Sequence, residues 1–98
     1  MSIFPNPFDI QSINSVRFLF ETNTSSSINS VISIYDFNLD KVFEFNCDQN
    51  NPHLDNDYLC TWNGKNFNNQ HVAQGVYFCK ININNKEFWE KLIVTNNK

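Results

Sequence analysis

The residues of this sequence best suited to acid–base chemistry are its two histidines, His53 and His71, because a histidine titrates near neutral pH. A catalytic histidine also needs a nucleophile and an orienting carboxylate within reach. Both histidines lie in polar stretches that we expect to be exposed loops, and the serines at 25–27 lack the glycine pattern of a nucleophile elbow. We therefore expect no catalytic site, and an enzyme is the least favoured class of protein.

Three aspartates in one polar stretch, Asp48, Asp55 and Asp57, are the best candidates for binding a metal ion. Carboxylate and amide oxygens are ligands that Ca²⁺ accepts. Their order does not follow the EF-hand loop, so a solvated acidic loop is the favoured interpretation and a weak Ca²⁺ site is the alternative. The sequence predicts no firm metal site and no cofactor.

The cysteines offer a third kind of chemistry. There are three, Cys47, Cys60 and Cys79, so at least one is unpaired within the chain. Cys60 and Cys79 either pair with each other or act as small buried hydrophobic residues, and we favour the second interpretation. No C-x-x-C pair is present, so neither a zinc site nor thioredoxin-like chemistry is expected.

The overall charge and hydropathy exclude other functions. The net charge is -3, and the seven lysines and arginines are scattered, so the basic surface of a nucleic-acid-binding protein is missing. No apolar run approaches the length of a membrane span. Hydrophobic residues make up 41% of the chain, which is enough to build one core, and we expect a single domain over residues 1–98.

Short strands are the elements that must position these residues. Apolar and polar residues alternate in several segments, and no segment keeps a helical period with caps. Between the segments lie polar turns, such as Asp36–Asp40, whose short side chains can bond the backbone. This pattern predicts an all-β sandwich of about seven strands. The predicted strands are Ser15–Glu21, Ser30–Asp36, Lys41–Asn46, Tyr58–Trp62, Gly75–Ile81 and Glu87–Thr95, with a polar loop over 47–57.

Three expectations concern packing. We expect Tyr58–Trp62 and Gly75–Ile81 to form an antiparallel hairpin whose long connection folds over one end of a sheet. Phe4 and Phe8 are expected to plug one end of the core. The last strand, Glu87–Thr95, has apolar residues on both faces, which indicates a strand that is covered on both sides or lies at an interface.

Several segments, in order, resemble the immunoglobulin-like C-terminal sorting domains of proteins exported by the type IX secretion system and, less closely, the related domain of the flagellar hook-capping protein. The chain departs from the sorting-domain pattern after Trp62, where the loop lacks the family's carboxylates and so offers poor Ca²⁺ ligands. The segments that carry the resemblance are Phe4-Pro-Asn-Pro-Phe8, Ser15-Val-Arg-Phe-Leu-Phe20, Val31-Ile-Ser-Ile-Tyr-Asp36, Trp62-Asn-Gly64, Val72-Ala-Gln-Gly-Val-Tyr-Phe78 and Lys91-Leu-Ile-Val94.

The resemblance implies an immunoglobulin-like, non-catalytic accessory domain that forms the C-terminal part of a larger secreted or cell-surface protein. Its implied partner is the secretion or cell-surface attachment machinery, with edge-strand pairing as one mode of recognition. Two segments would form the recognition surface, and their residues are Gly75, Val76, Tyr77, Lys91, Leu92, Ile93 and Val94.

Two alternative functions remain open. The first is a carbohydrate-binding module attached to a secreted glycan-degrading enzyme, in which an exposed aromatic ring stacks on a sugar. Trp89 is the candidate ring, since Trp62 falls at the core position of the family that the chain resembles. The second is a structural or oligomerising immunoglobulin-like domain. Neither nucleic acid nor insertion into a membrane is expected.

Overall fold

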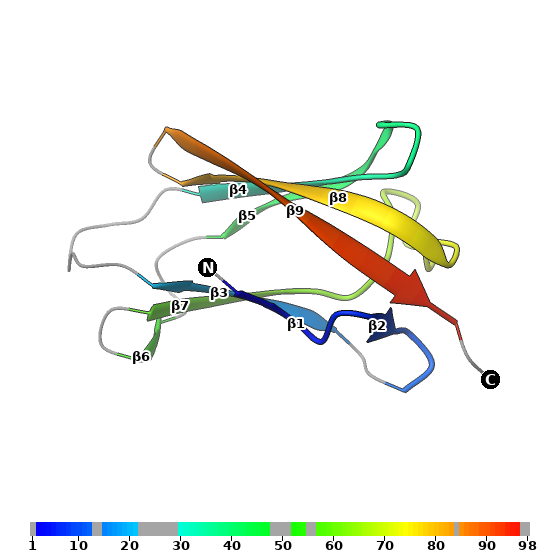
Figure 1. The fold of residues 1–98 in the computed structure, drawn as a ribbon, viewed down its shortest axis with the longest axis horizontal. Helices are drawn as coiled ribbons and strands as arrows, with labels where there is room; N and C mark the ends of the chain where they lie inside the picture. The colour runs from blue at the N-terminus through cyan, green and yellow to red at the C-terminus, as the bar shows by residue number, and fades with distance from the viewer. Residues whose placement is uncertain are drawn as a thin grey trace.

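The computed structural model describes residues 2–12, 15–21, 30–47, 52–54, 57–83 and 85–96, with the backbone alone described at 2, 19–21, 47, 52–54 and 57–59. These residues form strands and connections, and the strands pack as the two layers of a β-sandwich (Figure 1). The predicted all-β sandwich is therefore confirmed. The strands are β1 (Ser2–Phe4), β2 (Phe8–Asp9), β3 (Val16–Glu21), β4 (Ser30–Tyr35), β5 (Lys41–Cys47), β6 (Pro52–Leu54), β7 (Asp57–Trp62), β8 (Gly75–Ile83) and β9 (Lys86–Thr95).

The two layers differ in width. The narrower sheet has the strand order β1-β3-β7-β6, and the wider sheet has the order β2-β9-β8-β4-β5. Neighbouring strands are antiparallel, except that β2 runs parallel to β9, with Phe8 opposite Val94. Each of the long strands begins and ends within two residues of its predicted limits, because period-2 alternation is easy to detect over six residues or more.

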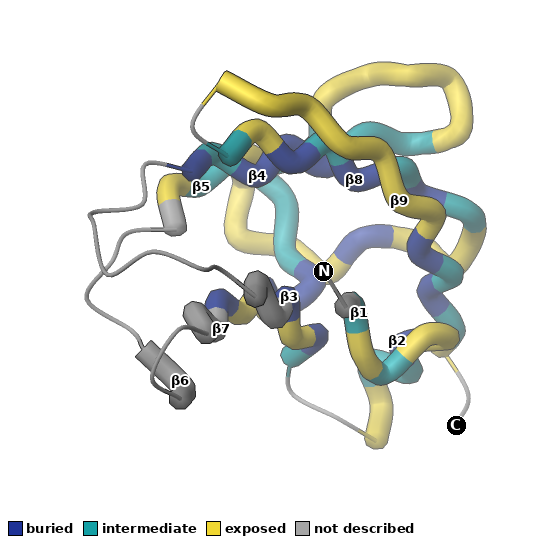
Figure 2. The backbone as a smooth tube through the Cα atoms, turned by 60° about the vertical axis from the view of Figure 1, so that its left-hand side comes forward, coloured by how far each residue is buried: buried dark blue, intermediate teal, exposed yellow. Residues whose placement is uncertain are grey.

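The core lies between the sheets, where the tube in Figure 2 is dark blue. The narrower sheet contributes Val16, Phe18, Cys60 and Trp62, and the wider sheet contributes alternate residues of β4, of β8 and of the end of β9. Burial of these apolar side chains is the main source of stability in such a sandwich. The buried residues of the wider sheet include Ile32, Ile34, Tyr77, Cys79, Ile81, Leu92 and Val94.

The N-terminal phenylalanines have different environments. Phe8 is fully buried and its ring lies 6.4 Å from the Trp62 ring, so Phe8 does plug the core as expected. The same expectation is wrong for Phe4, which is exposed, with the Arg17 guanidinium 5.9 Å from its ring centre. Phe4 ends the short edge strand β1, and its side chain lies at the surface.

The predicted hairpin of β7 and β8 is wrong, because these strands lie in different sheets. Alternation shows which residues share a face of a strand, and it does not show which strand lies alongside. The connection over residues 63–74 runs from one sheet to the other, as expected of a loop that covers a sheet end. It is held by Val72 N–H donating to Gly64 C=O (2.9 Å) and by Phe67 N–H donating to Val42 C=O on β5 (3.1 Å).

The predicted polar loop over 47–57 contains a further strand, β6 (Pro52–Leu54), which pairs with β7 at the edge of the narrower sheet. His53, expected in a loop, belongs to this strand. Three residues are too few to show alternation, and proline is tolerated in an edge strand because its missing N–H is not needed there.

The predicted turn at Asp36–Asp40 is confirmed. The Asp36 carboxylate accepts the backbone N–H groups of Asn38 and Asp40, both at 2.9 Å, and Leu39 adopts a positive φ of 66°. An equivalent turn follows β7 over residues 66–70. There the Asn66 side-chain oxygen accepts two backbone N–H groups, and Asn69 has a φ of 61°.

Candidate recognition surface

Of the residues considered for catalysis or metal binding, only His71 has a side chain that the structure describes. His71 is exposed and forms an isolated bridge with Lys65 at the start of the polar connection. Asp48 and Asp55 lie outside the described residues, and Asp57 opens β7 opposite Glu21. No group of three or more potential metal ligands occurs within the described part of the chain.

The two predicted recognition segments lie side by side. The start of β8 pairs with the end of β9, so that Gly75 faces Val94, Val76 faces Ile93 and Tyr77 faces Leu92. Of these paired residues, Tyr77, Leu92 and Val94 are buried in the core.

The remaining members of the two segments reach the surface. Gly75 and Lys91 are exposed, and Val76 and Ile93 are partly exposed on the outer face of the wider sheet. Within the predicted set, only these four are accessible at the surface, and the buried members position them from the core. The predicted set therefore divides into an outer surface and the core residues beneath it.

Tyr77 illustrates the positioning role. Its hydroxyl donates to the backbone carbonyl of Ala73 at 2.6 Å, which ties the end of the polar connection to β8. Burial raises the pKa of this phenol, with a smaller contribution from the charge of Asp36. The hydroxyl therefore stays protonated and can keep donating this hydrogen bond.

Sequence reasoning assigned no role to Asn6, which holds the end of β9. Its side-chain amide donates to the Lys91 carbonyl at 2.8 Å, and its side-chain oxygen accepts the Ile93 N–H at 3.0 Å. One asparagine thus pairs with β9 as a neighbouring strand would. No local signal in the sequence indicated this pairing, because Lys91 lies 85 residues further along the chain.

Further contacts continue along the same edge. Phe8 and Asp9 pair with Val94 and Thr95 as strand β2, and Ile10 N–H donates to the Thr95 carbonyl at 3.1 Å. We call residues 6–11 the N-terminal clasp, residues 91–95 the clasped half of β9, and residues 86–90 its free half. The clasp joins the first and the last of the segments that carry the family resemblance.

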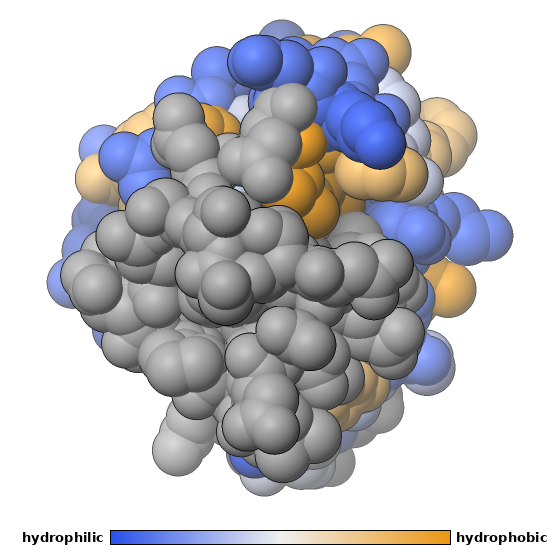
Figure 3. Space-filling model, turned by 90° about the vertical axis from the view of Figure 1, so that its left-hand side faces the viewer, coloured by the Kyte–Doolittle hydropathy of each residue, from blue (hydrophilic) through white to orange (hydrophobic). Residues whose placement is uncertain are grey.

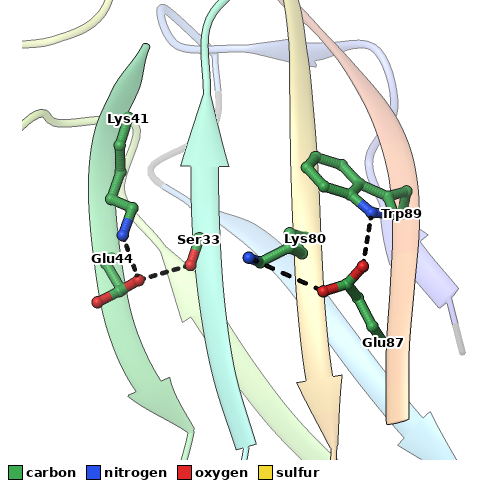
Figure 4. A network of polar contacts seen from close by, with 6 residues as sticks. All are labelled: Ser33, Lys41, Glu44, Lys80, Glu87 and Trp89. Carbon is green, nitrogen blue, oxygen red and sulfur yellow. Dashed lines mark hydrogen bonds and ion pairs between the residues drawn. The ribbon is translucent and has the colours of Figure 1, made fainter. Parts of the chain in front are cut away.

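The outer face of the wider sheet carries the Trp89 ring beside charged groups (Figure 4). Lys80 Nζ lies 5.9 Å from the ring centres of both Tyr35 and Trp89, and it faces Glu87 at 3.8 Å. Trp89 Nε1 donates to the Glu87 carboxylate at 3.2 Å. Trp89 is 50% exposed, as predicted, but its ring already has these neighbours. These contacts give a cation–π cluster on the sheet and supply no separate argument for a sugar site.

A second polar group lies on the neighbouring strands. Lys41 Nζ and the Ser33 hydroxyl donate to the same oxygen of Glu44, at 2.8 and 2.7 Å. The hydrogen bond from Lys41, followed by that from Ser33, lowers the pKa of Glu44, and the hydrogen bond with Glu44 raises that of Lys41. Lys41 and Glu44 are exposed, so their pair contributes little to stability.

The two cysteines left open by the sequence behave differently. Cys79 is a free thiol buried in the core, and burial, with a smaller contribution from Glu90, raises its pKa to about 12. Cys60 is also buried but takes part in a disulfide. The two therefore do not pair with each other, and the favoured interpretation holds for Cys79 and is wrong for Cys60.

The fold and surface define a small β-sandwich whose wider sheet presents the paired segments of β8 and β9. Residues 2–95 match the family described as the secretion system C-terminal sorting domain, and the chain belongs to this family. The expected role as a sorting module of type IX secretion is thereby confirmed, and such domains mark precursors of secreted or cell-surface proteins.

Two solved structures from Porphyromonas gingivalis share the fold. In dimeric latent PorU, 98% of this chain superimposes on 9% of the longer chain, with a TM-score of 0.77 and 22% identity. In PorZ, described as an essential bacterial surface component of the type IX secretion system, 97% of this chain covers 11% of that chain, with a TM-score of 0.64 and 15% identity. This chain thus spans about a tenth of each.

The comparisons do not support every part of the predicted resemblance. They favour the sorting-domain family and give no support to the flagellar hook-capping domain or to a glycan partner. No curated protein matches the chain. No helix among the described residues is long and apolar enough to cross a membrane.

Proposed function

We propose that this chain is the C-terminal sorting module of a larger exported precursor, has no catalytic role of its own, and is recognised through the clasped half of β9. The observation that carries the proposal is the pair of hydrogen bonds in which the Asn6 side chain donates to the Lys91 carbonyl and accepts the Ile93 N–H. They fix the backbone of this half, so that its outward side chains keep one arrangement for a partner to bind. Preorganisation of this kind lowers the entropic cost of recognition.

The chemistry of the surface indicates what the partner must offer. Val76 and Ile93 are adjacent apolar side chains on the outer face, and Lys91 adds an exposed positive charge beside Phe78, its opposite residue on β8. Phe37 stacks on Phe78, with ring centres 6.2 Å apart, and extends the apolar area. A partner in the secretion or attachment machinery would therefore present an apolar patch with a neighbouring carboxylate.

The disulfide at Cys60 supports an exported destination. Disulfides persist in oxidising compartments outside the cytosol. Inside the cytosol, thiols are kept reduced. In this proposal the domain reaches such a compartment while attached to its precursor, and the disulfide then constrains the unfolded chain.

The test is export of a reporter fused in front of residues 1–98 in a host with a type IX system. We expect the fused reporter outside the cell or on its surface. The variant with Lys91→Glu and Ile93→Asp should leave most of the reporter inside, because it reverses the charge and places a carboxylate on the apolar pair. Lys86→Glu is the matched control, since it makes the same charge change on the free half of the same strand.

Two outcomes would contradict the proposal in different ways. Retention of the unmodified fusion inside the cell would contradict the sorting role itself. Normal export of the double variant, with a folded domain by circular dichroism, would contradict the assignment of recognition to the clasped half.

A further inference from the structure

The free half of β9 has a neighbouring strand on one side only. Residues 86–90 pair with β8, and no strand lies on their other side among the described residues (Figure 1). The Ile93 N–H and the Thr95 carbonyl both face the clasp, so the odd-numbered residues of β9 direct their backbone groups toward this edge. Glu87 and Trp89 therefore offer backbone donors and acceptors to an added strand.

This half is also exposed on both faces. All residues from Lys86 to Lys91 are exposed, including Phe88 at 46% and Trp89 at 50%, and in Figure 2 this part of the tube is yellow. Figure 3 shows apolar surface beside the hydrophilic rim at the same end of the sandwich. Exposed aromatic residues on an open sheet edge are typical of a site that pairs with another chain.

The order of charges along residues 86–90 favours a second copy of this chain as the partner strand. In an antiparallel pair, residues that direct their backbone groups toward the partner must face each other, so odd residues face odd residues. One such register sets Lys86 opposite Glu90 of a second copy, with Phe88 facing Phe88 at the two-fold axis. It brings two pairs of opposite charges and one aromatic pair together. Glu87 and Trp89 then exchange backbone hydrogen bonds across the axis.

The neighbouring registers are poorer. A shift of the two-fold axis toward the start of β9 sets Glu87 opposite Glu87, and a larger shift toward the end of β9 sets Glu90 opposite Glu90. Both registers are destabilised, because like charges face each other. The register with Trp89 on the axis pairs Glu87 with Lys91. However, it sets Phe88 against Glu90 and brings the added strand against the Lys91 carbonyl that Asn6 already occupies.

We propose that the free half of β9 is a self-association edge, at which two copies of this chain pair antiparallel with Phe88 on the two-fold axis and Lys86 opposite Glu90. The pairing joins the two wider sheets into one continuous sheet and leaves the clasped half of each copy accessible. It is a function beyond the sorting role and does not depend on it. Charged residues on an edge strand usually prevent pairing, and here their order favours this register over its neighbours.

Sedimentation velocity of residues 1–98 over a range of concentrations tests the proposal. The paired edge is short, so we expect a weak dimer with a dissociation constant on the order of 0.1 mM. Glu90→Lys and Lys86→Glu should each weaken it about tenfold or more, because opposite charges become like charges. The variant with both changes restores opposite charges and should dimerise like the unmodified chain.

Asp40→Lys is the matched control, because it makes the same charge change as Glu90→Lys at an exposed turn that joins β4 to β5. It should leave the dimer unchanged. A chain that stays monomeric at millimolar concentration would overturn the proposal. So would single reversals that have no effect, or a double reversal that fails to restore association.

Oxidative cross-linking tests the register separately. Residues facing each other at the non-hydrogen-bonded position have Cα atoms about 4.5 Å apart, within the range of a disulfide. Phe88→Cys should therefore cross-link to itself on oxidation. Glu90→Cys alone should not, whereas a mixture of Glu90→Cys and Lys86→Cys should. Efficient cross-linking of Glu90→Cys to itself, or none by Phe88→Cys, would contradict the register.

Discussion

The two halves of β9 form one continuous strand, and they pair with β8 along their whole length. Their side chains alternate in the same way, yet Leu92 and Val94 are 0% and 1% exposed while Phe88, on the same side of the strand, is 46% exposed. The difference lies outside the strand. The N-terminal clasp pairs with one half only and brings the buried Phe8 opposite Val94, so burial along β9 depends on the neighbouring segment as well as on the alternation within the strand.

This difference separates two kinds of surface. The clasped half has a fixed backbone and presents a few outward side chains, which suits recognition by a rigid partner. The free half keeps its backbone groups available, which suits the addition of a strand. A single strand can therefore serve two partners without competition between them.

The largest expected effect comes from the core side of the strand. Leu92→Ala should lower the free energy of unfolding by about 2–5 kcal/mol, because it leaves a cavity beneath the clasped half. Phe88→Ala, the matched change on the free half, should cost about 1 kcal/mol or less. Urea unfolding followed by tryptophan fluorescence measures both. Similar losses in the two variants would remove the contrast between the halves.

The clasp itself should give the next effect. Asn6→Ala removes two hydrogen bonds to the backbone of β9 and should lower the free energy of unfolding by about 1–3 kcal/mol. Asn6→Asp keeps the acceptor for the Ile93 N–H but sets a carboxylate oxygen against the Lys91 carbonyl, and this repulsion should make its loss as large as that of Asn6→Ala. If Asn6→Ala unfolds at the same urea concentration as the unmodified chain, the clasp does not hold the strand.

A smaller effect depends on pH at the boundary between the halves, where Cys79 lies opposite Glu90. The thiol has a pKa of about 12 in the folded chain against an ordinary 9.0, so the stability it confers is complete below pH 9 and is lost between about pH 9 and 12. The loss is about 1.4 kcal/mol per pH unit above pH 9. Denaturation from pH 8 to 10 should therefore show a steeper decline than in Cys79→Ala. Equal slopes would contradict the buried, neutral thiol.

Much of the fold was predictable from the sequence. The long strands could be located because six or more alternating residues give a clear period. The turn at Asp36 could be located because a carboxylate that accepts hydrogen bonds within its own turn needs no distant partner. The assignment of strands to sheets was not predictable, since β7 and β8 alternate like hairpin partners but lie in opposite layers.

The recognition surface was predictable only in part. The resemblance located the two segments, but alternation could not show which face of the last strand is buried, because both faces carry apolar residues. The role of Asn6 depends on a contact across 85 residues of sequence, and no local rule gives such a pairing. The same limit applies to the disulfide at Cys60, because spacing does not determine which cysteines meet.

Amide hydrogen exchange along β9 tests the contrast between its halves most directly. At a concentration where sedimentation shows a monomer, the Ile93 amide should be protected, since it donates to Asn6, and the Glu87 and Trp89 amides should exchange fast. Asn6→Ala should remove the protection at Ile93 and leave the other two unchanged. Equal protection at all three positions in the monomer, or an Ile93 amide insensitive to Asn6→Ala, would contradict the division of β9 into a clasped and a free half.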